Sequence, residues 1–498
     1  MRIPVAVLVV LLGLPAAADQ IPQAVAKAAE PATDSAKTLP DLGDASEVVV
    51  TPADERRIGR GFMRQARAHL DLLDDPELNA YLRTLAGKLT HAAGIEDDTY
   101  HFFIVNNAAV NAFAVPGGYI GVHTGLLLVS RSEGELASVL AHEIAHVTQR
   151  HIPRMLADQQ RTTVPAIAAL IAGILLAGSG SDAGSAAVAV TTAAVAQRQI
   201  NFTRSFEEEA DRLGMQTLVA ADYDPRDMSA MFEVLLQSGR LYETALPEYL
   251  RSHPVTTRRI AEARDRATHY PAHADPDSGA FAHMQARLRA LSARDAKEAV
   301  RYFRAEHDSK RDTDANRYGL ALALTRTRDY GGAAKILDAL VVKRPDFPAY
   351  LTAAAENSIA AGRLDEGLAR YRRAAALLPD NAVVARYYAE ALLKAKRADA
   401  ARDWVRTALR SDARDPDLYR LLSRAAGEAG HLAEAHQAYA EYYYLNDEPK
   451  RALQQLKLAK QQPDANSYYQ QSIAARALAI EAELKSDPSA ADPVGDER

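Results

Sequence analysis

One short stretch of the chain carries the residue types and the spacing of a metal-dependent hydrolase. His142, Glu143 and His146 form a His-Glu-x-x-His motif inside an apolar run that favours a helix. Residues four apart lie about one turn apart on the same helical face, so both imidazoles can face one metal ion. Glu143 lies beside them and can reach a water molecule at the metal. The motif therefore predicts a zinc hydrolase.

A catalytic zinc site needs a third protein ligand, and it leaves the fourth position to water. The best candidate is Glu207, which opens a Glu-x-x-x-Asp pattern. Asp211 lies one turn further along the same face, where it can accept the ring N–H of a zinc-bound histidine. A solvated acidic first turn is the alternative for residues 207–209. The upstream motif favours the ligand role for Glu207.

The predicted chemistry is hydrolysis of a peptide bond. Glu143 takes a proton from the attacking water and later delivers it to the leaving amine. Zinc lowers the pKa of the water, polarises the carbonyl and stabilises the developing oxyanion. Because a His-Glu-x-x-His match also arises by chance in Ala-rich helices, its specificity depends on its surroundings. These are apolar flanks, a capping-box spacing from Ser132 to Glu135, and the downstream acidic helix.

The elements that must position these residues are helices and a small sheet. From Pro52 to Leu89, apolar residues recur at three- and four-residue spacing, and Asp75-Pro76 favours the start of a second helix. Three strand-like runs follow at residues 100–105, 111–115 and 119–123, with Pro116-Gly117-Gly118 as a turn between the last two. The motif helix is then expected from near Ser132 to His151.

An unusually apolar segment lies between the two halves of the site. Residues 164–177 are almost wholly apolar, a Gly/Ser-rich break follows, and a second Ala/Val-rich run continues to residue 196. The first run is short for a membrane span. One interpretation is a helical hairpin buried in the fold. The other is an apolar flap that covers the active site or touches a membrane or a substrate.

The C-terminal part of the chain repeats every 34 residues. Four similar segments have Tyr330, Leu364, Ala398 and Leu432 at the same place in a turn, each 34 residues after the last. A small residue follows three positions later in every segment: Ala333, Gly367, Ala401 and Ala435. A helix–turn–helix period of this length is the tetratricopeptide signature.

Tyrosines are frequent in these repeats. Tyr387-Tyr388 and Tyr442-Tyr443-Tyr444 are expected to be exposed in a groove that binds extended or unfolded peptide. Ordinary packing between helices is the alternative.

Composition excludes several classes of protein. The chain has 498 residues and a formal net charge of only −6, so it lacks the basic excess of a nucleic-acid-binding protein. Cysteine is absent, which excludes thiolate ligands, a cysteine nucleophile, disulfides and lipoprotein anchoring. The apolar run Val5–Leu14 and the small residues up to Ala18 predict a signal peptide cleaved near Ala18 and export to a bacterial periplasm.

The sequence resembles the zinc metallopeptidase superfamily of the CAAX prenyl proteases and the bacterial HtpX-like proteases, and among these it is most similar to periplasmic members with a tetratricopeptide tail. The resemblance covers nearly the whole mature chain. It is carried by residues 111–114 with 116–120, by His142–His146, by Glu207–Gly214 and by Ser252-His253-Pro254.

The resemblance implies a role for each matching residue. His142, His146 and Glu207 would bind one Zn²⁺, Glu143 would be the general base, and Asp211 would support a ligand from behind. His253 would lie at the zinc, either as a fourth ligand that displaces the water and keeps the enzyme latent, or as a transition-state donor. Arg259 would assist His253. Considered without the resemblance, His253 reads as an ordinary surface histidine.

The resemblance also implies how substrate binds. The strand that contains Asn111, Ala112, Phe113 and Ala114 would be an edge to which the substrate adds as an extra strand. The chain lacks the multiple spanning helices of the prenyl-protein-processing relatives. Misfolded or stalled envelope proteins are therefore the expected substrates.

The expected fold is mainly α. A zincin-like α+β metallopeptidase domain with a small sheet is followed by an all-α tetratricopeptide solenoid. The expected boundaries are 1–18 for the signal peptide, 19–50 for a flexible leader, 51–270 for the metallopeptidase domain and 280–485 for the repeats. The expected function is a periplasmic zinc endopeptidase that also assists outer-membrane protein assembly. The alternative is chiefly a chaperone or assembly factor with latent protease activity, whose repeats contact the outer-membrane assembly machinery.

Overall fold

The computed structural model describes residues 50–95, 99–158, 204–241, 248–273, 279–309 and 312–486. All of them belong to one compact unit, Ala45–Arg498. The predicted signal peptide, the apolar segment 164–196 and the leader up to residue 49 lie outside the described residues. Among the helices that are described, none is long and apolar enough to cross a membrane.

Two helices open the described chain, and both start as the sequence predicts. Helix α1 spans Pro52–His69, and the Thr51 and Asp54 side chains form a capping box at its start. Helix α2 spans Pro76–Ala92, with Asp75 as its N-cap and proline in its first turn. The Asp75 carboxylate accepts a hydrogen bond from the Leu78 backbone N–H at 3.0 Å. Apolar residues of α2 pack into the core beneath the sheet.

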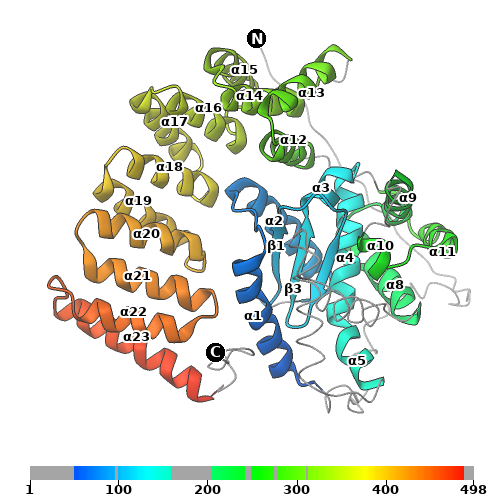
Figure 1. Cartoon of the computed structure of the whole chain (residues 1–498), viewed down its shortest axis with the longest axis horizontal. Helices are drawn as coiled ribbons and strands as arrows, with labels where there is room; N and C mark the ends of the chain where they lie inside the picture. The colour runs from blue at the N-terminus through cyan, green and yellow to red at the C-terminus, as the bar shows by residue number, and fades with distance from the viewer. Residues whose placement is uncertain are drawn as a thin grey trace, which may run out of the picture. The chain divides into compact units, whose positions relative to one another are not determined.

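The predicted small sheet is present, with three strands in the order β1-β3-β2 (Figure 1). Strand β1 (His101–Val105) pairs in parallel with β3 (Tyr119–His123), and β2 (Ala112–Val115) pairs antiparallel to β3. The turn between β2 and β3 requires glycine. Gly117 and Gly118 have φ values of 88° and 86°, and a Cβ at Gly118 would lie 2.3 Å from the Thr99 carbonyl oxygen. In the order β1-β3-β2, strand β2 lies at an edge of the sheet that the described residues form.

The motif helix follows a short helix, α3 (Thr124–Val129). Helix α4 spans Glu133–Thr148 and is capped by Ser132. The expected continuation to His151 is wrong, because Arg150 adopts a left-handed φ of 51° and ends the helix. His151 instead begins a separate helix, α5 (His151–Asp158).

The remaining helices around the site are α8 (Arg204–Ala220), α9 (Arg226–Leu241), α10 (Glu248–Ser252) and α11 (Thr257–Ala267). Helix α8 packs along α4. The two backbones come close at Gly214, where a Cβ would lie 3.1 Å from the His142 backbone nitrogen. A small residue at this position therefore lets α8 bring its acidic residues up to the motif helix.

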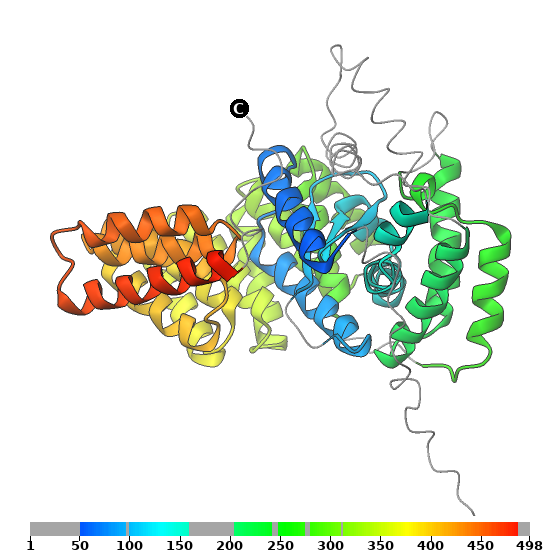
Figure 2. The same ribbon diagram turned by 90° about the horizontal axis from the view of Figure 1, so that it is seen from below.

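Helices α12–α23 form the repeat region, and successive helices pack against one another (Figures 1 and 2). The second helix of each predicted repeat begins at the residue that marks the period. The helices are α12 (Ala280–Ser292), α13 (Ala296–Asp308), α14 (Asp314–Arg326), α15 (Tyr330–Lys343), α16 (Pro348–Ala360), α17 (Leu364–Leu377), α18 (Ala382–Lys394), α19 (Ala398–Ser411), α20 (Pro416–Glu428), α21 (Leu432–Leu445), α22 (Pro449–Lys460) and α23 (Ser467–Ser486).

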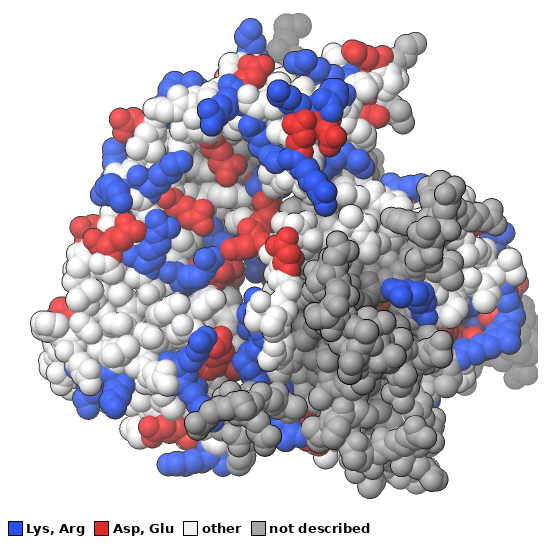
Figure 3. Space-filling model, in the orientation of Figure 1, with Lys and Arg blue, Asp and Glu red and all other residues white. Residues whose placement is uncertain are grey.

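The expectation that Tyr387 and Tyr388 are exposed is wrong. Both side chains are buried, and both rings lie near that of Tyr371, with centroids 6.5 and 6.2 Å away. The alternative, ordinary packing between helices, describes these two tyrosines. On the face of the molecule in Figure 3, basic and acidic side chains are interspersed over the repeats. This surface agrees with the small net charge of the chain.

Candidate metal centre

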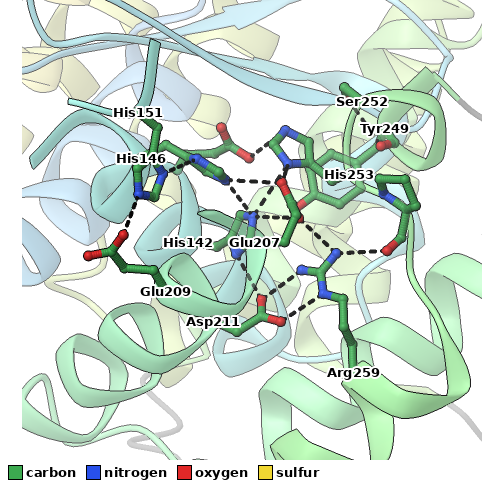
Figure 4. A network of polar contacts seen from close by, with 12 residues as sticks. His142, His146, His151, Glu207, Glu209, Asp211, Tyr249, Ser252, His253 and Arg259 are labelled. Carbon is green, nitrogen blue, oxygen red and sulfur yellow. Dashed lines mark hydrogen bonds and ion pairs between the residues drawn. The ribbon is translucent and has the colours of Figure 1, made fainter. Parts of the chain in front are cut away.

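Four side chains from three separate segments converge in the part of the molecule that precedes the repeats (Figure 4). His142 and His146 come from α4, Glu207 comes from the first turns of α8, and His253 follows α10. One potential ligand atom from each lies within 4.8 Å of the others, and all four residues are buried. The structure thus brings together every residue that was expected at the metal. Their roles as ligands stay predictions.

The two motif histidines both turn their Nε2 atoms toward the centre of the cluster. The Nε2 atoms of His142 and His146 lie 2.9 Å apart and face the centre of the cluster. The Glu207 carboxylate lies opposite, with Oε2 3.6 Å from His142 Nε2 and Oε1 3.5 Å from His146 Nε2. The helical spacing of four, together with the close packing of α8 on α4, produces this arrangement.

His253 is not a surface histidine, since only 2% of its surface is exposed. Its Nδ1 lies 2.9 Å from Glu207 Oε1 and 3.4 Å from His142 Nε2, so it enters the same cluster. Its Nε2 points the other way and lies 3.6 Å from Glu143 Oε1. Tyr249 stacks on the imidazole at 4.8 Å between centroids and holds the ring from behind.

A second layer of charge supports the cluster. Asp211 Oδ1 lies 3.0 Å from His142 Nδ1, the nitrogen that faces away from the centre. Arg259 donates two hydrogen bonds of 2.7 Å to the Asp211 carboxylate, and its Nη1 lies 2.8 Å from Glu207 Oε2. Burial alone would raise the pKa of Asp211, but hydrogen bonds from His142 and Arg259 lower it to about 2. Arg259 thus contacts two carboxylates, and its Nη1 also donates to the Pro254 backbone carbonyl, next to His253, at 3.0 Å.

Glu143 is buried beside the cluster and touches the sheet. Burial raises the pKa of its carboxyl, whereas His253 and His142 lower it, and the net shift is upward. The Ala114 backbone N–H donates a hydrogen bond to this carboxylate. Within the described part of the chain, strand β2 pairs with β3 alone, so the predicted substrate strand is an edge beside Glu143 there. Asn111, Ala112 and Ala114 are buried there, and Phe113 is half-buried.

His151 and Glu209 also lie near the cluster, and the motifs predict neither of them. His151 lies with its Nδ1 2.7 Å from His146 Nδ1, and its Nε2 lies 3.2 Å from Glu209 Oε2. The only sequence signals are a histidine five residues after His146 and a third glutamate in the acidic turn. Because α4 ends before Arg150 and the chain turns there, helical spacing alone could not show that the His151 side chain lies beside His146.

Fold and site together define the class of protein, a metallopeptidase followed by tetratricopeptide repeats. The family model "Peptidase family M48" matches residues 76–267, which include every residue of the cluster. A tetratricopeptide repeat model matches residues 358–425.

Relatives extend the similarity over most of the chain. The Beta-barrel assembly-enhancing protease of Escherichia coli (strain K12) is 32% identical over 445 residues, which cover 89% of this chain and 91% of the relative. The Putative beta-barrel assembly-enhancing protease of Vibrio cholerae is 35% identical over 442 residues, which cover 88% of this chain and 91% of the relative. The chain belongs to the β-barrel assembly-enhancing protease family of M48 metallopeptidases.

More distant similarities cover only parts of the chain. The Mitochondrial metalloendopeptidase OMA1 of Arabidopsis thaliana is 29% identical over 226 residues, covering 45% of this chain and 44% of the relative. The solved structure of MamA MSR-1 C2 is 18% identical, covers 34% of this chain and 95% of that chain, and has a TM-score of 0.26. The second similarity carries no argument about function.

Proposed function

We propose that this protein is a zinc-dependent endopeptidase of the bacterial periplasm that degrades misfolded or stalled envelope proteins and assists outer-membrane protein assembly. We further propose that His253 holds it latent. The observation that carries both proposals is the convergence of four buried ligand atoms within 4.8 Å, one of which belongs to His253.

The donor set fits zinc. Imidazole nitrogen and carboxylate oxygen are usual zinc ligands, and two histidines plus one glutamate make up a known catalytic set. His142, His146 and Glu207 would hold the ion, with Asp211 fixing the tautomer of His142 from behind. When bound there, zinc would polarise the scissile carbonyl and lower the pKa of a nearby water.

The protein's own residues supply the other parts of the reaction. Glu143 takes a proton from the attacking water and passes it to the leaving amine; its raised pKa suits both steps. An extended substrate would pair with the edge of β2, which places its backbone beside Glu143. Arg259 pairs with Asp211 and Glu207 and so keeps both carboxylates oriented.

His253 supports latency through two contacts at once. Its Nδ1 is directed at Glu207 and His142, the place where a fourth ligand would lie. Its Nε2 is directed at Glu143, so the same ring contacts both the general base and the residues that would hold the metal. Displacement of His253 would open the ligand position and release the base together.

A cleavage assay on an unfolded polypeptide tests the proposal with two variants. Glu143→Gln should lower the rate by about 10²- to 10⁴-fold while one zinc per chain remains bound. His253→Ala should raise basal proteolysis. Glu298→Gln, at a side chain that is 63% exposed on α13, is the control and should match the wild type. Full activity in Glu143→Gln would remove the mechanism, and a fall in His253→Ala would remove the latency.

The periplasmic location and the envelope substrates rest on the predicted signal peptide and on the family. The repeats support a second role in recruiting proteins, because tetratricopeptide solenoids present extended binding surfaces. The protein would then act chiefly as an assembly factor, with proteolysis held in reserve. Complementation of a deletion strain by Glu143→Gln separates the two roles: rescue of outer-membrane integrity favours assembly, and failure favours proteolysis.

A further inference from the structure

We infer that His151 is a positioning residue that, together with Glu209, fixes the tautomer and orientation of the metal ligand His146. This inference rests on the proposed zinc site. It concerns the side of the His146 ring that faces away from the cluster. Neither the His-Glu-x-x-His motif nor Asp211 explains what holds that side. The relevant contacts form a line from Glu209 on α8 through His151 at the start of α5 to His146 on α4 (Figure 4).

The tautomers along this line follow from the geometry. His146 directs Nε2 to the cluster, so a neutral His146 that coordinates through Nε2 carries its proton on Nδ1. That proton points to His151 Nδ1, 2.7 Å away, which must accept it. His151 therefore carries its own proton on Nε2 and donates it to Glu209 Oε2 at 3.2 Å. Each nitrogen then has one defined role.

The position of His151 is enforced from several sides. Arg150 turns the chain with a left-handed φ of 51°, and its guanidinium is held by the Glu55 carboxylate at 2.7 Å and the Val50 carbonyl at 2.6 Å. The His151 ring is fully buried and stacks on Phe206, with centroids 4.6 Å apart and planes 13° apart. A turn held in this way directs the imidazole back at α4.

Glu209 is fixed as well. Arg154 Nη1 lies 3.0 Å from the same carboxylate oxygen that accepts from His151. The arrangement repeats, with one more link, the way in which Arg259 holds Asp211 behind His142. Groups behind a metal-bound histidine typically contribute 10- to 100-fold to metal affinity. His146 would thus be backed by a neutral imidazole, and His142 directly by a carboxylate.

Three substitutions separate this role from packing. His151→Asn keeps an acceptor near the position of Nδ1 and loses the contact with Glu209. His151→Gln keeps a donor near the position of Nε2 and leaves His146 without that acceptor. His151→Phe keeps the stack on Phe206 and loses both hydrogen bonds. The measurements are the zinc dissociation constant of the full-length apo-protein, by chelator competition, and its melting temperature without metal.

The expected result is a zinc affinity 10- to 100-fold weaker in His151→Gln and His151→Phe, with His151→Asn recovering most of the loss. Wild-type affinity in His151→Gln would overturn the inference. Equal losses in the Asn and Gln variants would overturn it too, because only burial or packing would then matter. Failure of the wild-type protein to bind zinc would instead overturn the proposed function, so the two failures are distinguishable.

Discussion

Two buried clusters of charged side chains differ in what faces their centre. In the candidate metal centre, imidazole nitrogens and carboxylate oxygens point at one another within 4.8 Å. In the second cluster, the guanidinium of Arg287 on α12 lies among acceptors. It contacts Asp75 at 2.8 Å and Glu77 at 3.4 Å, at the start of α2. Its Nη atoms also donate to the hydroxyls of Tyr318 and Tyr387 at 3.0 and 2.6 Å.

The second cluster joins the catalytic half to the repeats. Asp75 caps α2 and Glu77 lies in its first turn. By contrast, Arg287, Tyr318 and Tyr387 belong to α12, α14 and α18. Arg287 provides the cation for both carboxylates and donates to both hydroxyls, so protein atoms occupy the centre of this cluster. Converging lone pairs in the first cluster suit a cation. The difference teaches that burial and charge alone do not identify a metal site. What identifies it is whether the atoms at the centre are acceptors that could bind a cation or already include a cationic side chain.

The largest expected effect comes from removing the central cation of the second cluster. Arg287→Met leaves Asp75 and Glu77 buried without their partner, which should lower the free energy of unfolding by about 3–5 kcal/mol. Zinc affinity should not change, because the substitution does not touch the first cluster. Urea unfolding followed by circular dichroism, together with a zinc titration, measures both quantities.

Two controls sharpen this prediction. Arg424→Met removes an exposed arginine of α20 that pairs with Glu428, and it should change stability by less than about 0.5 kcal/mol. Adding Asp75→Asn and Glu77→Gln to Arg287→Met removes the unpaired charges and should recover part of the loss. Equal stability of Arg287→Met and Arg424→Met would break the comparison between the clusters.

A substitution in the metal centre should weaken zinc binding and leave the stability of the apo-protein nearly unchanged. Glu207→Gln removes the carboxylate from the proposed ligand set, so zinc affinity should fall by more than the roughly 100-fold cost of losing a supporting group, or about 2.7 kcal/mol. Arg259 keeps its two bonds to Asp211, and a carboxamide still accepts hydrogen bonds. The apo-protein should therefore keep its stability within about 1 kcal/mol. Unchanged zinc affinity would count against the ligand role.

Local patterns predicted much of the fold. Apolar spacing located the start of α1, capping residues located the starts of α2 and α4, and the 34-residue period located the second helices of four repeats. These signals could be read because they depend on neighbours in sequence. The alternation of turn and β-branched residues located the three strands to within one residue. The pairing order β1-β3-β2 was not predicted, since strand order depends on contacts between distant segments.

The parts that sequence missed depend on tertiary contacts. His151 returns to His146 only because Arg150 turns the chain and Glu55 holds that turn. Tyr387 is buried because Arg287, 100 residues earlier, occupies the position beside it. The four residues of the metal centre were predicted, although His253 required the family resemblance, since a lone histidine before proline has no distinguishing local pattern.

The smallest expected effect is a pH dependence at the margin of the second cluster. Glu356 on α16 is partly buried; burial raises the pKa of its carboxyl from 4.5 to about 7, opposed by Arg287 and reinforced by Glu77, Asp75 and Glu390.

A raised folded-state pKa means that the contribution of Glu356 to stability is complete below pH 4.5 and is lost as the pH rises through 7. Glu356→Gln stays neutral, so it should be as stable as the wild type at pH 4. At pH 8 it should be about 1–2 kcal/mol more stable, which is less than the full shift implies because the carboxylate is partly exposed to solvent. Glu298→Gln, at a side chain that is 63% exposed on α13, is the control with little expected effect. Unfolding curves at both pH values measure the difference. Parallel pH profiles for the wild type and Glu356→Gln would contradict this prediction. They would show that Arg287 already stabilises the Glu356 carboxylate, so that the second cluster can hold one more negative charge than the comparison assumes.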